Sequence, residues 1–287
     1  MKNSKRFILF FLASVLCFTA CQNSDGKKGG MKDITTFHGS LDSVAGPKEE
    51  VSLINNFPKA LYRIYTIDGL GSFYVDSRID IIKNQLRSGQ IWENEIVDLL
   101  KKHVKPGSTA IDIGSHVGTH TLSMSKLIGK DGQVVAFEPQ IKLYSELVMN
   151  MALNGCRNVT AYRCALGDIS KDIEMSPSVA DNEGGTGIGQ GGDCAKMITL
   201  DSLNLDNVSF IKIDVENFEY EVLKGAEQTI RKSHPVMIIE IMGNTYNPIP
   251  NRAELVHRVL HQVEQMGYTL KYIEGSWSDW LAIPVRP

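Results

Sequence analysis

The most informative feature of this chain is the segment AIDIGSHVGTHTL at residues 110–122. It predicts a buried strand that ends at Asp112-Ile113-Gly114, a turn that contains glycine, and a helix that begins at Gly118. A second apolar strand follows and ends in Glu138. A strand, a glycine turn, a helix, a second strand and an acid, in this order, form the nucleoside site of many α/β sheets.

Each part of this motif has a chemical use. Glycine lets the backbone approach a ligand closely, and the start of a helix offers free N–H groups to a carboxylate or phosphate. A carboxylate at the tip of the second strand can accept both hydroxyls of a ribose, so Glu138 is the predicted ribose ligand and Asp112 is predicted to position the cofactor. The spacing D-x-G-x-x-x-G differs from the G-x-G-x-x-G of dinucleotide enzymes, which favours S-adenosylmethionine over NAD.

From residue 91 onward the chain alternates between predicted strands and helices. The expected buried strands cover residues 110–113, 133–138, 159–165, 210–214 and 236–241. Two last strands, 268–273 and 280–283, are joined by a Gly-Ser turn and predict a hairpin. This pattern predicts an α/β fold with a mostly parallel seven-stranded sheet, helices on both faces and an antiparallel closing hairpin.

A second group of charged residues follows the strand at 210–214. Asp214, Glu216 and Glu219 are the candidate catalytic residues. Helix capping is the alternative, because acids at a helix start stabilise it by about 0.3–1 kcal/mol each. Asp214 ends a buried strand, however, where an uncompensated acid is costly, so a partner or a chemical role is expected. Glu240 lies in the apolar run MIIEI, and the same argument applies to it more sharply.

The first 21 residues are predicted to be an export signal rather than part of the fold. Basic residues precede an apolar run over Phe7–Ala20, which is too short for a transmembrane helix of about 20 residues. The run ends at Cys21 and resembles the lipobox of bacterial lipoproteins, which implies cleavage before Cys21 and lipid attachment to its sulfur. Residues 22–50 are predicted to be a flexible tether, 51–90 a small hairpin extension, and 91–287 the main domain.

Overall composition limits the partners. The net charge is −3 and no basic stripe is present, so nucleic acid is not an expected partner. The cysteines after Cys21 show no metal-ligand spacing, so no metal site is predicted. Residues 176–192 are rich in glycine and interrupt the alternation. They are either a disordered surface insertion or a mobile lid, and they follow a strand whose carboxyl end lies where ligands bind.

At this point the sequence blocks can be compared with a known family. The chain resembles the FkbM family of S-adenosylmethionine-dependent methyltransferases in these blocks: AIDIGSHVGTHTL, VVAFEPQ, ALGD, MITLDSL, FIKIDVENFEYEVLKGA and PVMIIEI. The resemblance implies a class I, Rossmann-like methyltransferase sheet and O-methylation, often of sugar or polyketide hydroxyls. The family commonly has Ala-Asn at Ser115-His116 and Gly at Asn217. The first departure leaves the glycines in place, and Asn tolerates unusual backbone angles better than most residues.

The leading hypothesis is therefore an S-adenosylmethionine-dependent O-methyltransferase that acts on a small-molecule or glycan acceptor. The resemblance places Asp112, Gly114 and Gly118 against the methionine part of the cofactor, and Leu166 and Asp168 near its adenine. The three carboxylates after the fourth strand would line the methyl-transfer face, and one of them would serve as the base.

Two other readings stay open. One is a nucleotide-dependent oxidoreductase on a similar sheet, and the other is an exported lipoprotein whose methyltransferase fold is idle. The predicted export conflicts with the predicted activity, because S-adenosylmethionine is made in the cytosol and an exported enzyme would lack it. The export signal favours association with a membrane through a lipid on Cys21, while a translation start at Met31 would instead give a cytoplasmic protein.

Overall fold

The computed structural model describes residues 31–242, 252–276 and 278–285. The predicted signal at residues 1–21 and the first part of the predicted tether lie outside these residues. Within the described residues, no helix is long and apolar enough to span a membrane.

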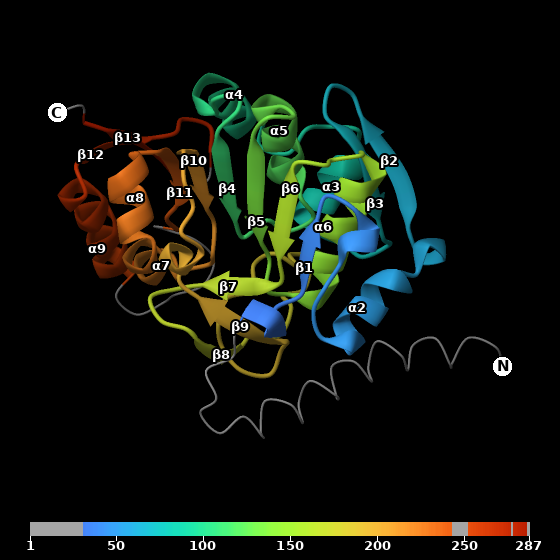
Figure 1. Ribbon diagram of the computed structural model, residues 1–287. Helices are drawn as coiled ribbons and strands as arrows, with labels where there is room; N and C mark the ends of the chain where they lie inside the picture. The colour runs from blue at the N-terminus through green and yellow to red at the C-terminus, as the bar shows by residue number, and fades with distance from the viewer. Residues whose placement is uncertain (1–30, 243–251, 277, 286–287) are drawn as a thin grey trace.

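An eight-stranded sheet forms the centre of the molecule (Figure 1). Its strands, in spatial order, are β1 (Thr36–His38), β6 (Val159–Tyr162), β5 (Gln133–Phe137), β4 (Thr109–Ile113), β10 (Val208–Ile213), β11 (Val236–Glu240), β13 (Asp279–Pro284) and β12 (Tyr268–Tyr272). The five strands from β6 to β11 run parallel, and β13 pairs antiparallel with both β11 and β12. The predicted parallel sheet with a closing hairpin is confirmed, and β1 adds an eighth, antiparallel strand.

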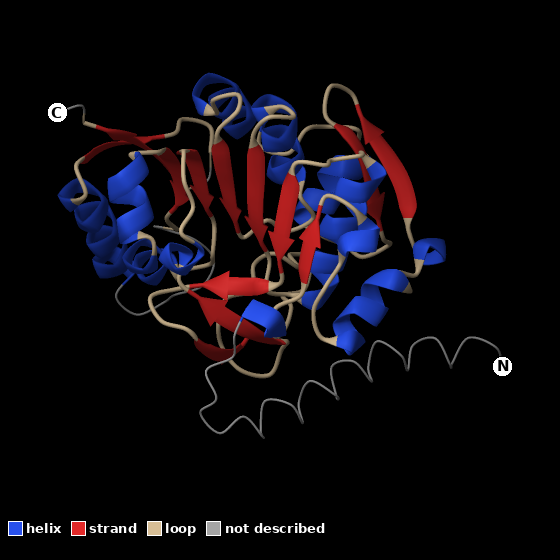
Figure 2. Cartoon of the chain, viewed as in Figure 1, coloured by secondary structure: helices blue, strands red, loops and turns tan. Residues whose placement is uncertain are grey.

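Helices cover both faces of this sheet (Figure 2). One face packs on α4 (Asn94–His103), α5 (Thr119–Ile128) and α6 (Ile141–Leu153), and the other on α7 (Glu219–Gly225), α8 (Glu227–Ser233) and α9 (Arg252–Gln265). Side chains alternate between the two faces, as the period of two along a strand requires. In β4, Ala110 packs toward α4–α6 while Ile111 and Ile113 pack toward α7–α9. The polar positions Asp112 and Lys212 therefore face the α4–α6 layer.

The predicted flexible tether is wrong for residues 31–50. The strand β1 pairs with β6, with Phe37 opposite Ala161, and Phe37 is fully buried. The helix α2 (Lys48–Asn55) follows, and its Glu50 carboxylate accepts a hydrogen bond from Arg163 Nη1 at 2.6 Å. The glycine-rich composition near residue 30 gave no sign of this three-residue strand, in which Phe37 is the one apolar residue.

Within the predicted hairpin extension, β2 (Arg63–Ile67) and β3 (Gly71–Val75) pair antiparallel. It is not an independent unit, because its backbone forms hydrogen bonds with the side chains of Asn150 in α6 and of Asn154 at the C-cap of that helix. Ser72 N donates to Asn154 Oδ1 at 2.9 Å, and Tyr74 N donates to Asn150 Oδ1 at 2.7 Å. The helix α3 (Ile81–Arg87) follows the hairpin and was not predicted.

The predicted third strand at 159–165 is two strands in two sheets. After β6 the chain turns at Arg163 into β7 (Cys164–Leu166), which forms a three-stranded sheet with β9 (Cys194–Ile198) and β8 (Lys171–Glu174). This small sheet lies near the carboxyl ends of β5 and β6 (Figure 1). It carries the glycine-rich segment 176–192 between β8 and β9, and so places that segment at the ligand-binding edge.

The other regular elements of the described residues are four short 3-10 helices. They are η1 (Met31–Asp33), η2 (Leu41–Ser43), η3 (Lys59–Leu61) and η4 (Leu200–Leu203).

Candidate functional site

The turn between β4 and α5 is built on two glycines with left-handed backbone angles. Gly114 has φ +84°, and a Cβ at this position would lie 1.8 Å from the carbonyl oxygen of Asp214. Gly118 has φ +89° and is the N-cap of α5. A Cβ at Gly118 would lie 2.6 Å from Leu147 Cδ1. Side chains are excluded at both positions, so the turn lies close to the end of β10 and the start of α5 packs closely on α6.

Glu138 follows β5 directly and binds the backbone of this turn. Its Oε2 accepts a hydrogen bond from His116 N at 3.0 Å, and its Oε1 accepts one from Gln140 N at 2.9 Å. Burial raises the pKa of Glu138 to about 7, although both backbone N–H groups act to lower it. Each carboxylate oxygen has two lone pairs, so the carboxylate can still accept two ribose hydroxyls.

Asp112 lies within β4 rather than in the turn, and it is almost fully buried. One carboxylate oxygen accepts a hydrogen bond from Thr121 Oγ1 of α5 at 2.5 Å. The other, Oδ1, is buried and has no hydrogen-bond partner among the described residues. Because an unpaired buried acceptor is costly, Oδ1 is suited to a ligand that donates a hydrogen bond, such as an ammonium group.

Leu166 and Asp168 have structural contacts in the described residues. Leu166 is buried in the apolar core beneath α7. The Asp168 carboxylate lies 2.6 Å from Lys224 Nζ at the end of α7, and this bond lowers the pKa of Asp168. Their predicted place near the adenine stays a prediction.

The three predicted catalytic carboxylates are not equivalent. Glu219 is buried at the start of α7, where its Oε1 accepts a hydrogen bond from Asn217 N at 3.0 Å, and burial raises its pKa to about 7. Glu216 and Asn217 both adopt positive φ, +53° and +75°, so the turn after β10 uses the left-handed angles expected of Asn217. Glu219 therefore stabilises this turn.

Asp214 and Glu216 lie together with Glu240, and carboxylate oxygens of the three are within 4.8 Å of one another. Burial acts to raise the pKa of Asp214, but the Lys212 ammonium at 2.7 Å from its Oδ2 lowers that pKa to about 2. Burial, and then the charge of Asp214, raise the pKa of Glu240 well above its usual range. The cofactor-free pair therefore keeps a proton on Glu240 and a negative charge on Asp214.

Four residues that the sequence analysis did not select complete this site. They are Glu93 before α4, His120 in α5, Lys212 in β10 and Asp279 in β13. His120 Nε2 lies 3.6 Å from Glu93 Oε2, and burial lowers the pKa of His120 to about 3. Burial likewise raises the pKa of Glu93 to about 8. A lysine inside the apolar strand VSFIKI was the one signal in the sequence, because a buried ammonium needs a carboxylate partner.

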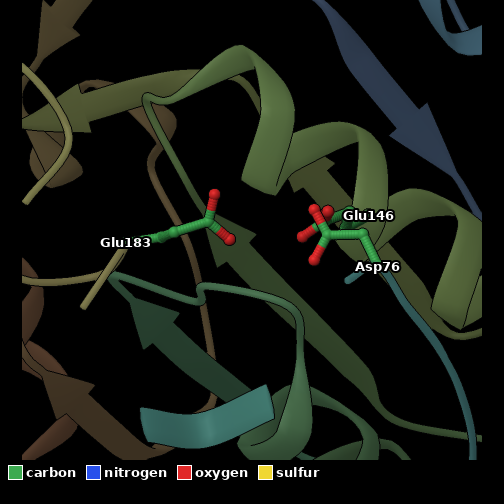
Figure 3. Close-up of side chains that lie close together, drawn as sticks. All are labelled: Asp76, Glu146 and Glu183. Carbon is green, nitrogen blue, oxygen red and sulfur yellow. The ribbon is translucent and has the colours of Figure 1, made fainter. Parts of the chain in front are cut away.

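Ion pairs hold the glycine-rich segment 176–192 against the rest of the domain, at the carboxyl edge of the sheet. Glu183 is buried and makes ion pairs with Lys83 of α3 and Lys142 of α6, the latter at 2.9 Å. Figure 3 shows the Glu183 carboxylate directed toward Asp76 and Glu146, which bind the same two lysines. The segment also approaches both the His116 turn and the turn after β10. A Cβ at Gly184 would lie 2.8 Å from His116 Cδ2, and one at Gly187 would lie 3.0 Å from the Glu216 carbonyl.

The sequence of the domain decides the family. The model of the Methyltransferase FkbM domain matches residues 112–270. The chain belongs to the FkbM methyltransferase family. Its cofactor is therefore S-adenosylmethionine, and the turn fits that molecule, since the unpaired Asp112 Oδ1 suits its ammonium group and Glu138 suits its ribose.

Curated relatives agree with this assignment. The hexuronic acid methyltransferase AglP of Haloferax volcanii is 28% identical over 151 residues, which cover 51% of this chain and 61% of the relative. Protein-L-isoaspartate O-methyltransferase 1 of Arabidopsis thaliana is 32% identical over 80 residues, or 28% of this chain and 35% of the relative. The matched part of the chain thus spans less than two thirds of the length of these relatives.

Solved structures with similar folds include methyltransferase FkbM from Methylobacillus flagellatus, with a TM-score of 0.44 and 15% identity. That match covers 70% of this chain and 52% of the other. Aeropyrum pernix fibrillarin, solved with bound S-adenosyl-L-methionine, gives a TM-score of 0.42 at 13% identity and covers 80% of this chain and 85% of the other.

Proposed function

We propose that this protein transfers a methyl group from S-adenosylmethionine to a hydroxyl of a sugar, either free or in a glycan. The family supports methyl transfer, and the hexuronic acid methyltransferase of Haloferax volcanii supports a sugar acceptor. The observation that carries the proposal is the position of Asp214. Its backbone contacts Gly114 in the cofactor turn, while its carboxylate joins the group with Glu240.

The chemistry needed from the protein is modest. When bound, S-adenosylmethionine supplies a methyl group that its sulfonium already activates. The protein must hold a hydroxyl in line with that methyl group and accept the hydroxyl proton. Carboxylates that accept hydrogen bonds from vicinal sugar hydroxyls would do both. Asp214 is ionised at neutral pH, so it is the proposed base.

The alternatives predict different behaviour. Membership of a methyltransferase family argues against an oxidoreductase. An exported protein with an idle fold would neither bind S-adenosylmethionine nor transfer its methyl group. Mass spectrometry of the purified full chain for co-bound S-adenosylmethionine or S-adenosylhomocysteine separates that reading from ours.

The direct test supplies labelled S-adenosylmethionine to the full chain with methyl β-glucuronide or methyl β-glucoside. We expect label in the sugar, released by acid as a methyl ether. Asp214→Asn should lower turnover at least about tenfold with little change in melting temperature. Asp98→Asn removes an exposed surface acid of α4 and is the matched control. A sugar that stays unlabelled while S-adenosylmethionine binds would refute the acceptor class. Full activity in Asp214→Asn would refute the base.

A further inference from the structure

The carboxylates at the ends of β10, β11 and β13 form one row on one face of the sheet. In the parallel pair β10–β11, Ile213 lies opposite Ile239, so Asp214 and Glu240 come next to each other. In the antiparallel pair β11–β13, Glu240 lies directly opposite Asp279. Side chains at paired positions leave the same face, with Cβ atoms about 4.5–5.5 Å apart. All three carboxylates therefore point into the α4–α6 layer, side by side.

The spacing of the carboxylate oxygens suits a metal ion. Asp214, Glu216 and Glu240 each offer one oxygen, and these oxygens lie within 4.8 Å of one another. Oxygens bound to one hard divalent cation at about 2.0–2.6 Å must lie about 3–5 Å apart. The three residues come from two strand ends and the turn between β10 and α7, so the fold rather than one local segment brings them together.

An independent observation comes from Asp279. Its side chain is 2% exposed, and its Oδ2 has no hydrogen-bond partner among the described residues. It stands across from Glu240 on the same face of the sheet, and the charge of Asp214 acts on it. A buried carboxylate oxygen without a donor is costly unless a cation compensates it.

A second group of acids in the protein shows what compensation by lysine looks like. Asp76, Glu146 and Glu183 also lie within 4.8 Å of one another (Figure 3). Lys83 and Lys142 each make ion pairs with all three of them. The ammonium groups of these two lysines therefore already lie among the three carboxylates.

In the row at the strand ends, Lys212 pairs with Asp214. His120 belongs to α5, which covers this face of the sheet. Burial, and then the charge of Lys212, lower the pKa of His120, so this side chain is neutral at physiological pH. Glu240 Oε1 accepts a neutral hydrogen bond from Ser278 Oγ at 3.0 Å. Among the described residues, Lys212 is the ammonium that an ion pair places in this row, and the proton held on Glu240 is what a bound divalent cation would replace.

We propose that Asp214, Glu216 and Glu240, with Asp279 beside them, bind one divalent cation of the Mg²⁺ or Mn²⁺ type. Oxygen-only ligands select these hard cations over zinc or copper. Mg²⁺ keeps several waters and needs few protein carboxylates, so the remaining positions are open to other oxygens. The sequence analysis predicted no metal, because it searched for ligands close together along the chain.

The role of the cation rests on the proposed function. A sugar with vicinal hydroxyls can replace two of the waters bound to the cation. This exchange would fix the acceptor beside the cofactor turn. The cation would also lower the pKa of a bound hydroxyl and so help Asp214 to accept its proton.

The test measures metal binding alone, on the full chain after treatment with a chelator. Mn²⁺ is titrated, and the free ion is followed by its electron paramagnetic resonance signal. We expect one saturable site per chain and a higher melting temperature in the presence of Mn²⁺. Glu240→Gln, which keeps the side-chain shape, should weaken Mn²⁺ binding at least tenfold and abolish the melting shift. Asp279→Asn should weaken it as well, and serves as the second variant if Glu240→Gln does not fold.

Asp98→Asn is the matched control, because it changes an exposed acid of α4 that pairs with Lys101 and should leave Mn²⁺ affinity unchanged. The proposal is overturned if no saturable site appears below about 1 mM Mn²⁺, the weak end of protein cation sites. It is also overturned if affinity survives in Glu240→Gln and Asp279→Asn, or falls equally in Asp98→Asn. Since neither cofactor nor acceptor is present, a failure here leaves the proposed methyl transfer standing, and the reverse also holds.

Discussion

At the scale of single residues, the site divides into positions that local sequence determines and positions that only the fold brings together. Gly114, Gly118 and Glu138 follow directly from the strand–turn–helix pattern, and the structure places all three around one turn. Lys212 and Asp279 could not be assigned in this way. Each is unremarkable along the chain and becomes informative only when register places Lys212 opposite Asp112 and Asp279 opposite Glu240.

Glu138 gives the sharpest prediction at this scale, because burial raises its pKa to about 7. Ribose hydroxyls bind best to the ionised carboxylate, so affinity for S-adenosylmethionine should rise as pH increases from about 6 to 8 and then level off. Glu138→Gln should bind more weakly at pH 8, by about 1.5–3 kcal/mol or roughly ten- to hundredfold, and should lose the pH dependence. Isothermal titration calorimetry across this range measures both effects.

Glu219→Gln is the control, since burial raises the pKa of Glu219 to the same value of about 7 in a capping position. The raised pKa also fixes the sign for stability. A carboxyl whose folded pKa exceeds the ordinary value of about 4.3 stabilises the fold at low pH and loses that contribution as pH rises toward 7. Cofactor affinity and cofactor-free stability should therefore change in opposite directions with pH. A wild-type affinity that is flat from pH 6 to 8 would remove Glu138 from the ribose site.

At the scale of elements, the regular alternation of strands and helices was predictable and the irregular connections were not. Helices α4, α5, α6 and α9 lie before and between the predicted strands, as the expected alternation requires, and each has an apolar face. The small sheet of β7, β8 and β9 was missed. Its strands are short, and β8 has mostly polar, partly exposed residues, so periodicity gives little signal.

The glycine-rich segment 176–192 is the element whose function can be tested directly. Glu183 anchors it to Lys83 and Lys142. Glu183→Gln leaves Asp76 and Glu146 for these two lysines, and Arg78, which also pairs with Glu183, is exposed enough for water to solvate its charge. We therefore expect a modest loss of stability, about 1–3 kcal/mol, the cost of weakened buried hydrogen bonds. The segment itself should become more sensitive to protease.

If the segment closes over the acceptor, the same variant should raise the Michaelis constant for the acceptor while affinity for S-adenosylmethionine stays near normal. Limited proteolysis and steady-state kinetics measure the two effects. Lys101→Gln, which breaks an exposed ion pair with Asp98 on α4, is a control for loss of a surface charge. Unchanged kinetics together with increased proteolysis would show that the segment is a structural insertion and not a lid.

At the scale of the whole molecule, fold class was predictable because five apolar strands alternate with helices. The boundary of the domain was not. The sequence analysis began the main domain at residue 91, whereas β1 adds a strand at 36–38 and the hairpin β2–β3 packs on α6. Composition averaged over residues 22–50 suggested a tether, but three residues of β-strand with Phe37 fully buried were enough to extend the sheet.

The position of β1 bears on location, the last property to be tested. We propose that the protein is held at a membrane by lipid on Cys21, because basic residues, an apolar run and a cysteine in this order form a coherent export signal. The described fold begins at Met31 in η1, with Ile34 and Phe37 already buried in the core. A product that starts at Met31 would thus keep every described element, so both forms are compatible with the fold.

Metabolic labelling with a fatty acid, followed by fractionation, distinguishes the lipid-anchored form from the form that starts at Met31. We expect label in the membrane fraction of wild type and its loss in Cys21→Ala, with Cys156→Ala, which changes a free buried cysteine, retaining it. An unlabelled cytosolic protein whose first residue is Met31 would instead refute the anchor, and it would place the enzyme where S-adenosylmethionine is made.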